Sequence, residues 1–145
     1  MSQPTRADWG DIDETDLDAQ CAFKQFFMKS FSEAEEMFQA NALYYQEDLQ
    51  SMPSAAFNFY APALAKYITS ERARGDSDGA SSFLHMVVWM LKTARAAIAP
   101  EIETVLLDAS RRIAKDQQFY GADVDIYGRF SEVCAEIQDL AKDRT

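Results

Sequence analysis

The feature that most restricts the fold is a run of apolar residues near the middle of the chain. The run is interrupted only by His85 and consists of Phe83, Leu84, Met86, Val87, Val88, Trp89, Met90 and Leu91. On a helix it is apolar on nearly every side, which is typical of the central helix of a bundle. Two adjacent valines also fit a strand, but the length of the segment and the absence of turns favour a helix. We therefore expect a central helix over about residues 80–98.

The N-terminal half contains signals for several helix boundaries. Asp13 or Thr15 can cap a first helix, because a side-chain oxygen there accepts from a free backbone N–H. Ser32 and Glu35 have the spacing of a capping box and predict that a second helix starts there. Pro53 cannot donate a helical hydrogen bond, so that helix must end before it and a third follows.

The C-terminal half is divided in the same way. Residues 74–79 are rich in Gly, Asp and Ser and predict a loop. Pro100 suits the first position of the next helix, and Gly121 suits its end. A last helix begins at residues 123–125 and has Gly128 inside it. The whole pattern predicts an all-α, single-domain bundle of five to six helices around the apolar one.

The domain is expected to span residues 15–145. Residues 1–14 contain four acidic residues, Pro4 and Gly10, with little apolar periodicity, and they predict an acidic, flexible tail. Trp9 is the exception in this segment, because an indole side chain can dock onto the body of the domain.

The charge of the chain excludes several classes of partner. The sequence has 24 acidic and 14 basic residues and a net charge of −10. Autonomous nucleic-acid binding needs a basic surface, and an anionic membrane repels an acidic one. The apolar run is far shorter than the roughly 20 residues of a membrane span. The N-terminal residues lack the basic start and apolar run of a secretory signal, so we expect a cytoplasmic protein.

The metal-ligating residues are too few or wrongly spaced for a metal site. The chain has one histidine, His85, and two cysteines, Cys21 and Cys134, which do not form a CxxC pair. A calcium loop from Asp11 needs Gly at its sixth and Glu at its twelfth position, where the chain has Asp and Ala. We predict no metal and no cofactor. His85 is expected to be a partly buried structural residue bonded to a carbonyl or carboxylate.

The sequence gives little support for an enzyme. The pairs of acidic residues stand at expected helix starts or on polar faces, where the helix dipole and solvent account for them. No nucleotide-binding or nucleophile motif is present. An enzyme that uses His85 with a metal or haem remains the third hypothesis, after the two given below.

Aromatic and acidic residues are concentrated in the first half of the chain. Residues 1–60 contain eleven acidic and three basic residues, a net charge of −8. Aromatic residues follow one another closely here, and neighbours on a helix diverge by about 100°, so some of Tyr44, Tyr45, Phe59 and Tyr60 are expected to reach the surface. Exposed aromatics beside carboxylates are typical of protein interfaces. The candidate contact residues are Glu35, Glu36, Tyr44, Tyr45, Glu47, Asp48 and Tyr60.

One segment carries a resemblance to a known type of protein. Phe59-Tyr60-Ala61-Pro62-Ala63 lies within residues 56–67, about a tenth of the chain. It resembles the aromatic–Tyr–x–Pro–Ala helix entry of small bacterial proteins, some of them immunity-like. The resemblance implies a small, acidic, single-domain inhibitor that blocks a basic toxin such as a nuclease.

Two hypotheses for the function follow. The first is a non-catalytic interaction module, an acidic inhibitor or immunity protein that covers a basic site on a partner protein. The second is a helical ligand-binding or regulatory module, because the apolar helix 83–91, which includes Trp89, and the methionines Met28, Met37, Met86 and Met90 could line an apolar pocket. A cavity of several hundred Å³ along the central helix would favour the second hypothesis. The oligomeric state is open.

Overall fold

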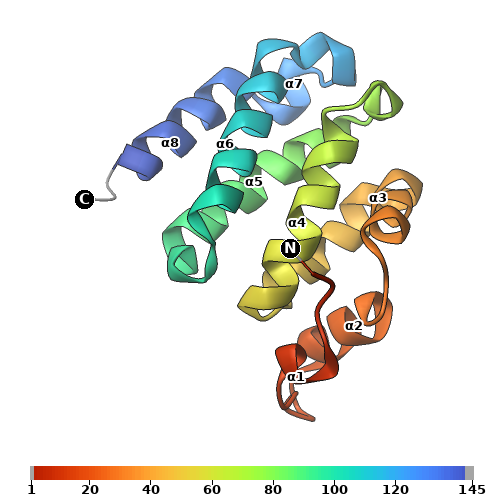
Figure 1. Ribbon diagram of the computed structural model, residues 1–145. Helices are drawn as coiled ribbons and strands as arrows, with labels where there is room; N and C mark the ends of the chain where they lie inside the picture. The colour runs from red at the N-terminus through yellow and green to blue at the C-terminus, as the bar shows by residue number, and fades with distance from the viewer. Residues whose placement is uncertain (1, 143–145) are drawn as a thin grey trace.

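A computed structural model of the chain describes residues 2–142. Helices are the only regular secondary structure in that range, which confirms the all-α prediction. Figure 1 shows α1 and α2 at one end of the molecule and α6, α7 and α8 toward the other, with α3, α4 and α5 between them. Residues 1 and 143–145 lie outside the described residues. Residue 1 belongs to the expected tail, residues 1–14, and residues 143–145 belong to the expected domain, residues 15–145. The α-helices are α1 Arg6–Trp9, α2 Leu17–Phe26, α3 Phe31–Gln46, α4 Ser54–Ile68, α5 Ser77–Thr93, α6 Pro100–Lys115, α7 Val124–Tyr127 and α8 Phe130–Lys142. Four 3-10 helices connect them: η1 Glu47–Ser51, η2 Glu71–Ala73, η3 Arg95–Ala97 and η4 Gln117–Tyr120.

The most completely buried helix is α4. It runs through the middle of the molecule between α3 and α6 and also contacts α1 and η1 (Figure 1). All four residues from Phe57 to Tyr60 are buried, because neighbouring elements cover the helix on several sides. Of the four aromatic residues of which some were expected to reach the surface, Phe59 and Tyr60 are therefore buried, whereas Tyr44 is exposed.

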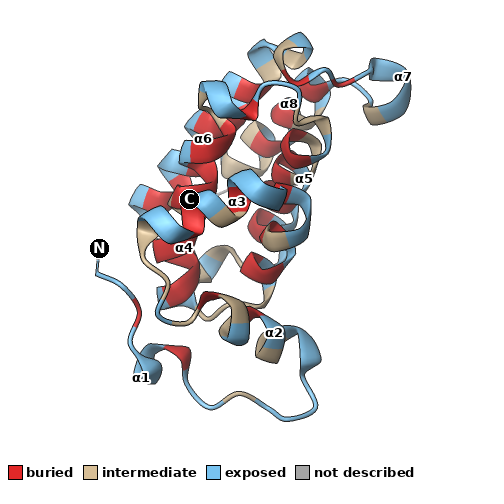
Figure 2. Cartoon of the chain, turned by 90° about the vertical axis from the view of Figure 1, so that its right-hand side faces the viewer, coloured by how far each residue is buried: buried red, intermediate tan, exposed pale blue. Residues whose placement is uncertain are grey.

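The apolar helix α5 begins and ends earlier than expected, at Ser77 and Thr93. It packs against α3, α6 and α8, and Figure 2 shows buried residues along the sides of α4, α5 and α6 that face the interior. One side of α5 remains open. His85 is exposed, so the expectation that it is partly buried is wrong, and Trp89 one turn further along is also exposed.

The N-terminal segment is attached to the domain through Trp9. A capping box between Thr5 and Asp8 starts α1, and the buried Trp9 follows at its end. The indole ring packs edge-on against Phe23, with ring centroids 5.4 Å apart, and lies 6.5 Å from the ring of Tyr60. Residues 6–9 are therefore part of the domain and not of a tail.

The α3 helix starts two residues before the expected position. Its capping box is formed by Ser30 and Glu33, whose backbone and side chains exchange hydrogen bonds of 2.9 and 3.1 Å. The prediction of a box at Ser32 and Glu35 is therefore wrong. Helix α3 continues to Gln46, across a kink at Asn41.

Two of the other predicted boundaries are confirmed, whereas Asp16 and not Asp13 or Thr15 caps α2, and Gly121 ends η4 and not α6. Pro53 separates η1 from α4, and Pro100 is the first residue of α6, as expected. Gly128 does not lie inside the last helix. It ends α7 with a φ of 73°, which a side chain would strain, and α8 begins two residues later. Within residues 2–142, no helix combines the length and apolar character that crossing a membrane requires.

Candidate functional site

The open side of α5 forms one wall of a groove, which we name the α3–α5 groove. Its volume is about 490 Å³. The opposite wall is the end of α3 together with η1, and α2 contributes one residue. The lining residues are Asp18, Leu43, Gln46, Glu47, Gln50, Ser82, His85, Met86 and Trp89.

Helical spacing explains why these residues line one groove. On α5 the lining residues fall at 82, 85, 86 and 89, and on the α3–η1 wall they fall at 43, 46, 47 and 50. Both sets have offsets of 0, 3, 4 and 7, which place them on one face of a helix. Because α3 and α5 pack against each other, the two faces lie side by side.

The apolar surface of the groove comes from three residues. Leu43 is 43% exposed and Trp89 is 41% exposed, whereas Met86 is buried. An aromatic and an aliphatic side chain that remain accessible beside a buried methionine can anchor an apolar group.

The charge of the groove is negative. Asp18 and Glu47 are exposed carboxylates, and the lining includes no Lys or Arg. Asp48 follows Glu47 but points into the protein, where it is 7% exposed. Burial raises the pKa of Asp48 to about 6, the Cys21 hydrogen bond lowers it, and the charges of Glu47 and Asp18 raise it further. Above that pH, Asp48 adds a third negative charge close to the groove.

Gln46 lines the groove and carries a buried hydrogen-bond acceptor that is not used. The residue is 2% exposed, and its Nε2 donates to the carbonyl oxygen of Gly79 at 3.2 Å. Its Oε1 is buried and accepts no hydrogen bond from the residues that the structure describes. An unsatisfied buried amide oxygen is unfavourable, and an N–H group of a bound molecule would satisfy it.

The structure does not bring the seven candidate contact residues together. Only Glu47 lines the groove. Tyr44 is 51% exposed, as expected, but together with the half-buried Tyr45 it lines a separate concave surface of about 510 Å³. Glu36 is exposed on α3 and lines neither surface.

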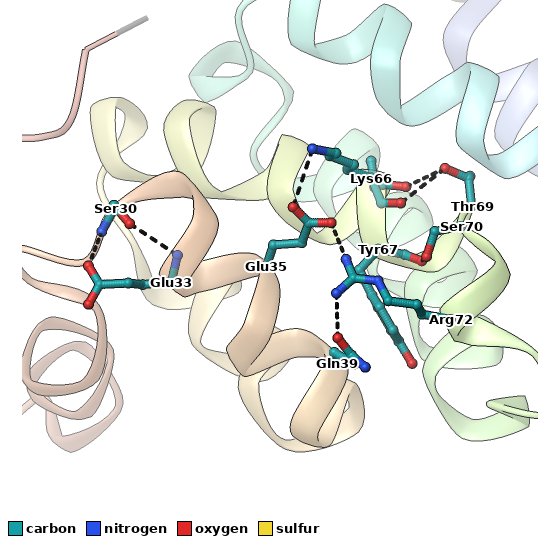
Figure 3. A network of polar contacts seen from close by, with 10 residues as sticks. Ser30, Glu33, Glu35, Gln39, Lys66, Tyr67, Thr69, Ser70 and Arg72 are labelled. Atoms are coloured by element: carbon teal, nitrogen blue, oxygen red, sulfur yellow. Dashed lines mark hydrogen bonds and ion pairs between the residues drawn. The ribbon is translucent and has the colours of Figure 1, made fainter.

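Glu35, one of the predicted contact residues, is buried and paired within the protein. Figure 3 shows its carboxylate between Lys66 and Arg72. Lys66 Nζ lies 3.4 Å from one carboxylate oxygen, and Arg72 bonds the other while also donating to Gln39. These contacts attach α3 to α4 and to η2, which is a structural role.

Tyr60 and Asp48 are also unsuited to direct contact. The Tyr60 hydroxyl lies 2.8 Å from the carbonyl oxygen of Phe26 and 2.7 Å from that of Lys29. Burial raises the pKa of Tyr60 to about 12, with a further contribution from Glu33. In both residues the polar group is bonded to partners within the fold, to Phe26 and Lys29 for Tyr60 and to Gln25 for Asp48.

The sequence analysis missed five lining residues: Asp18, Leu43, Gln46, Gln50 and Ser82. The repeated offset of 0, 3, 4 and 7 was a usable signal for two helical faces, but it does not say that the faces adjoin. Among residues 2–142, no three His, Cys, Asp or Glu side chains are grouped so that they could hold a metal ion.

Comparison of the chain with protein-family models, with curated proteins and with solved structures finds no match. The candidate site is therefore interpreted from its geometry and charge alone.

Proposed function

We propose that this protein is a non-catalytic interaction module that binds a basic segment of a partner protein in the α3–α5 groove. The partner segment carries a Lys or Arg side chain next to an apolar one. By covering a basic site, the module acts as a cytoplasmic inhibitor of the partner, as immunity proteins do with toxins.

The observation that carries this proposal is the combination of charge and apolar surface in one groove. Asp18 and Glu47 lie on the same surface as the exposed side chains of Leu43 and Trp89, without a neighbouring Lys or Arg. Carboxylates attract a basic segment and speed its association, whereas the aromatic and aliphatic side chains slow its dissociation.

Each part of the groove has a distinct role in this binding. The cationic side chain of the partner lies between the two carboxylates, and a shift of the buried Gln46 side chain lets Oε1 accept one of its N–H groups. The apolar side chain packs on Leu43 and Trp89. The net charge of −10 supports long-range attraction of a basic protein.

A second candidate function is the binding of a small organic amine in the same groove. The volume of about 490 Å³ lies within the usual range of small-molecule sites. Met86 and Trp89 are two residues of the predicted apolar pocket. However, the groove is bordered by polar side chains, so a charged amine suits it better than an apolar ligand.

The test is affinity capture of partners from cells that produce the protein, at low and high salt, with three variants beside the original chain. Glu47→Lys and Trp89→Ala change the groove. Asp139→Lys makes the same charge change on an exposed position of α8 and serves as the matched control. We expect a stoichiometric, salt-sensitive basic partner that both groove variants lose and the control retains.

Two results would contradict the proposal. One is a partner that both groove variants retain, and the other is the absence of a partner at low salt. Mass spectrometry of the protein under native conditions separates the two candidates, because a bound amine adds a small mass that the same groove variants remove.

A further inference from the structure

A second concave surface has the opposite charge character. It has a volume of about 590 Å³ and lies where the end of α4 and η2 approach the end of α6 and η4. We name it the basic pocket. Its lining residues are Thr69, Ser70, Glu71, Arg74, Arg112, Lys115, Asp116, Phe119 and Tyr120.

The cations of this pocket outnumber its carboxylates, although the protein as a whole is acidic. Arg74 follows η2, whereas Arg112 and Lys115 lie one turn apart on α6. Of the two carboxylates, Glu71 is paired with Arg74 and Asp116 accepts from the backbone N–H of Phe119 at 3.3 Å.

Two of the three cations are available to a ligand. Arg112 and Lys115 form no ion pair with any residue in the described range 2–142. Their neighbour Arg111 differs, because it pairs with Asp108 at 2.6 Å and does not line the basic pocket. The unpaired cations of α6 are therefore those that line the basic pocket.

Contacts within the protein hold the arginines in place. Arg74 Nε donates to Glu71 at 2.8 Å, and its guanidinium lies 4.6 Å from the centre of the Phe119 ring. Arg112 Nη2 donates to the carbonyl oxygen of Thr69 at 3.2 Å, which uses one of its five N–H groups. The remaining donors are thus positioned at little further cost in conformational entropy.

The wall between the arginines is also fixed. The Tyr120 hydroxyl donates to the carbonyl oxygen of Ile68 at 2.7 Å, and the Gly75 N–H donates to the carbonyl oxygen of Phe119 at 3.0 Å. These bonds join η4 to the end of α4 and to the loop after η2. The pocket is therefore formed before any ligand binds.

We propose that the basic pocket binds the phosphate group of a phosphorylated small molecule. A phosphate monoester has close to two negative charges and three terminal oxygens, so it can accept from guanidinium and ammonium groups that approach from different directions. A volume of about 590 Å³ is larger than a phosphate needs and leaves room for an organic group beside Phe119.

The test is a titration followed by amide NMR, with inorganic phosphate, adenosine monophosphate and adenosine as probes and with sodium chloride at matched ionic strength. We expect saturable shifts at residues 69–74 and 112–120 with both phosphate-containing probes and none with adenosine or chloride. Tighter binding of adenosine monophosphate than of phosphate would indicate that the organic group is bound as well. Binding should weaken below about pH 6, where a phosphate monoester takes up a proton.

Three variants test the residues. Arg112→Gln and Lys115→Gln each remove a charge-assisted contact and should raise the dissociation constant about tenfold. Arg111→Gln removes the same charge from the neighbouring position and should leave it unchanged. Lys115 is exposed and forms no hydrogen bond or ion pair with the residues that the structure describes, so Lys115→Gln keeps the test valid if Arg112→Gln unfolds.

Three results would overturn the proposal. They are the absence of saturable shifts, equal weakening by Arg111→Gln, and shifts confined to Lys24 and Lys29, which line the surface beside Tyr44. The outcome is independent of the α3–α5 groove, because Glu47→Lys is expected to leave phosphate binding unchanged.

Discussion

The side-chain amide of Gln25 donates a hydrogen bond of 2.6 Å to the carboxylate of Asp48. This bond joins α2 to η1, next to the wall of the α3–α5 groove. Burial of Asp48 and the nearby charges of Glu47 and Asp18 raise its pKa, so its ionised form is less favourable in the folded protein than in water. The position of α2 relative to the groove thus depends on a carboxylate that titrates close to neutral pH.

The free energy of unfolding is expected to fall as the pH rises from about 4 to about 6. Because the pKa of Asp48 is about 6 in the folded protein and 3.8 ordinarily, the folded state binds the proton more tightly over this interval. Asp48→Asn removes this dependence and should raise stability at pH 7 by roughly 1 to 2 kcal/mol. Urea unfolding at several pH values measures both effects.

The matched control for this prediction is Asp139→Asn, which neutralises an exposed carboxylate on α8. In this variant the free energy of unfolding should fall between pH 4 and pH 6 by as much as in the original chain. If Asp48→Asn is less stable than the original chain at pH 7, the cost of burying the charge has been overestimated.

The Tyr60 hydroxyl is expected to contribute to stability through the end of α2. Tyr60→Phe keeps the ring among Trp9, Phe26 and Phe59 but removes the donor that two backbone carbonyls share. Loss of a buried donor costs about 1–3 kcal/mol. Thermal and urea unfolding would measure this loss, and Tyr44→Phe, at an exposed hydroxyl, should change stability by much less.

Helix boundaries set by local chemistry could be predicted, whereas those decided by tertiary contacts could not. Pro53 and Pro100 act through their own backbone, so the helix boundaries beside them could be predicted from the sequence alone. Two serines, Ser30 and Ser32, are each followed by a glutamate three residues later, so the local pattern fits either start. Glu35 is instead drawn into the ion pairs with Lys66 and Arg72 shown in Figure 3, and these residues are distant in sequence.

Burial and the site depend on the same distant contacts. An apolar composition predicted that α5 is central, but α4 is more completely covered because α3 and α6 flank it. The groove was only partly predictable, since Trp89 and Met86 were apparent candidates while Gln46 becomes relevant only when α3 lies beside α5. Charge alone placed the expected contacts on Glu35 and Asp48, which the fold buries.

Arg95 is expected to hold the end of α8. Its guanidinium pairs with Glu103 at 2.9 Å and donates to the carbonyl oxygens of Leu140 and Ala141 at 2.7 and 2.8 Å. Arg95→Ala leaves a nearly buried carboxylate and two helix-terminal carbonyls without this donor, at a cost of about 3 kcal/mol. Hydrogen exchange should accelerate most in the last turn of α8. An unchanged exchange rate there would show that the helix end is held by other contacts. Arg111→Ala, at an exposed ion pair, is the control.

Gln46 is expected to affect stability and binding in opposite directions. In Gln46→Met a side chain of similar length replaces a buried amide whose oxygen has no described partner. The hydrogen bond to the Gly79 carbonyl is lost, but that bond is long at 3.2 Å. The desolvation cost of the amide disappears as well, so the free energy of unfolding should stay level or rise by up to about 1 kcal/mol.

Binding of the basic partner or amine should weaken in the same variant, because an N–H group in the groove then lacks its acceptor. We expect a dissociation constant roughly five- to tenfold higher by calorimetry. Gln50→Met, at an exposed position in the same lining, controls for the general loss of polarity. A Gln46→Met protein that is markedly less stable would mean that the amide serves the fold, and unchanged binding would mean that its oxygen does not face the ligand.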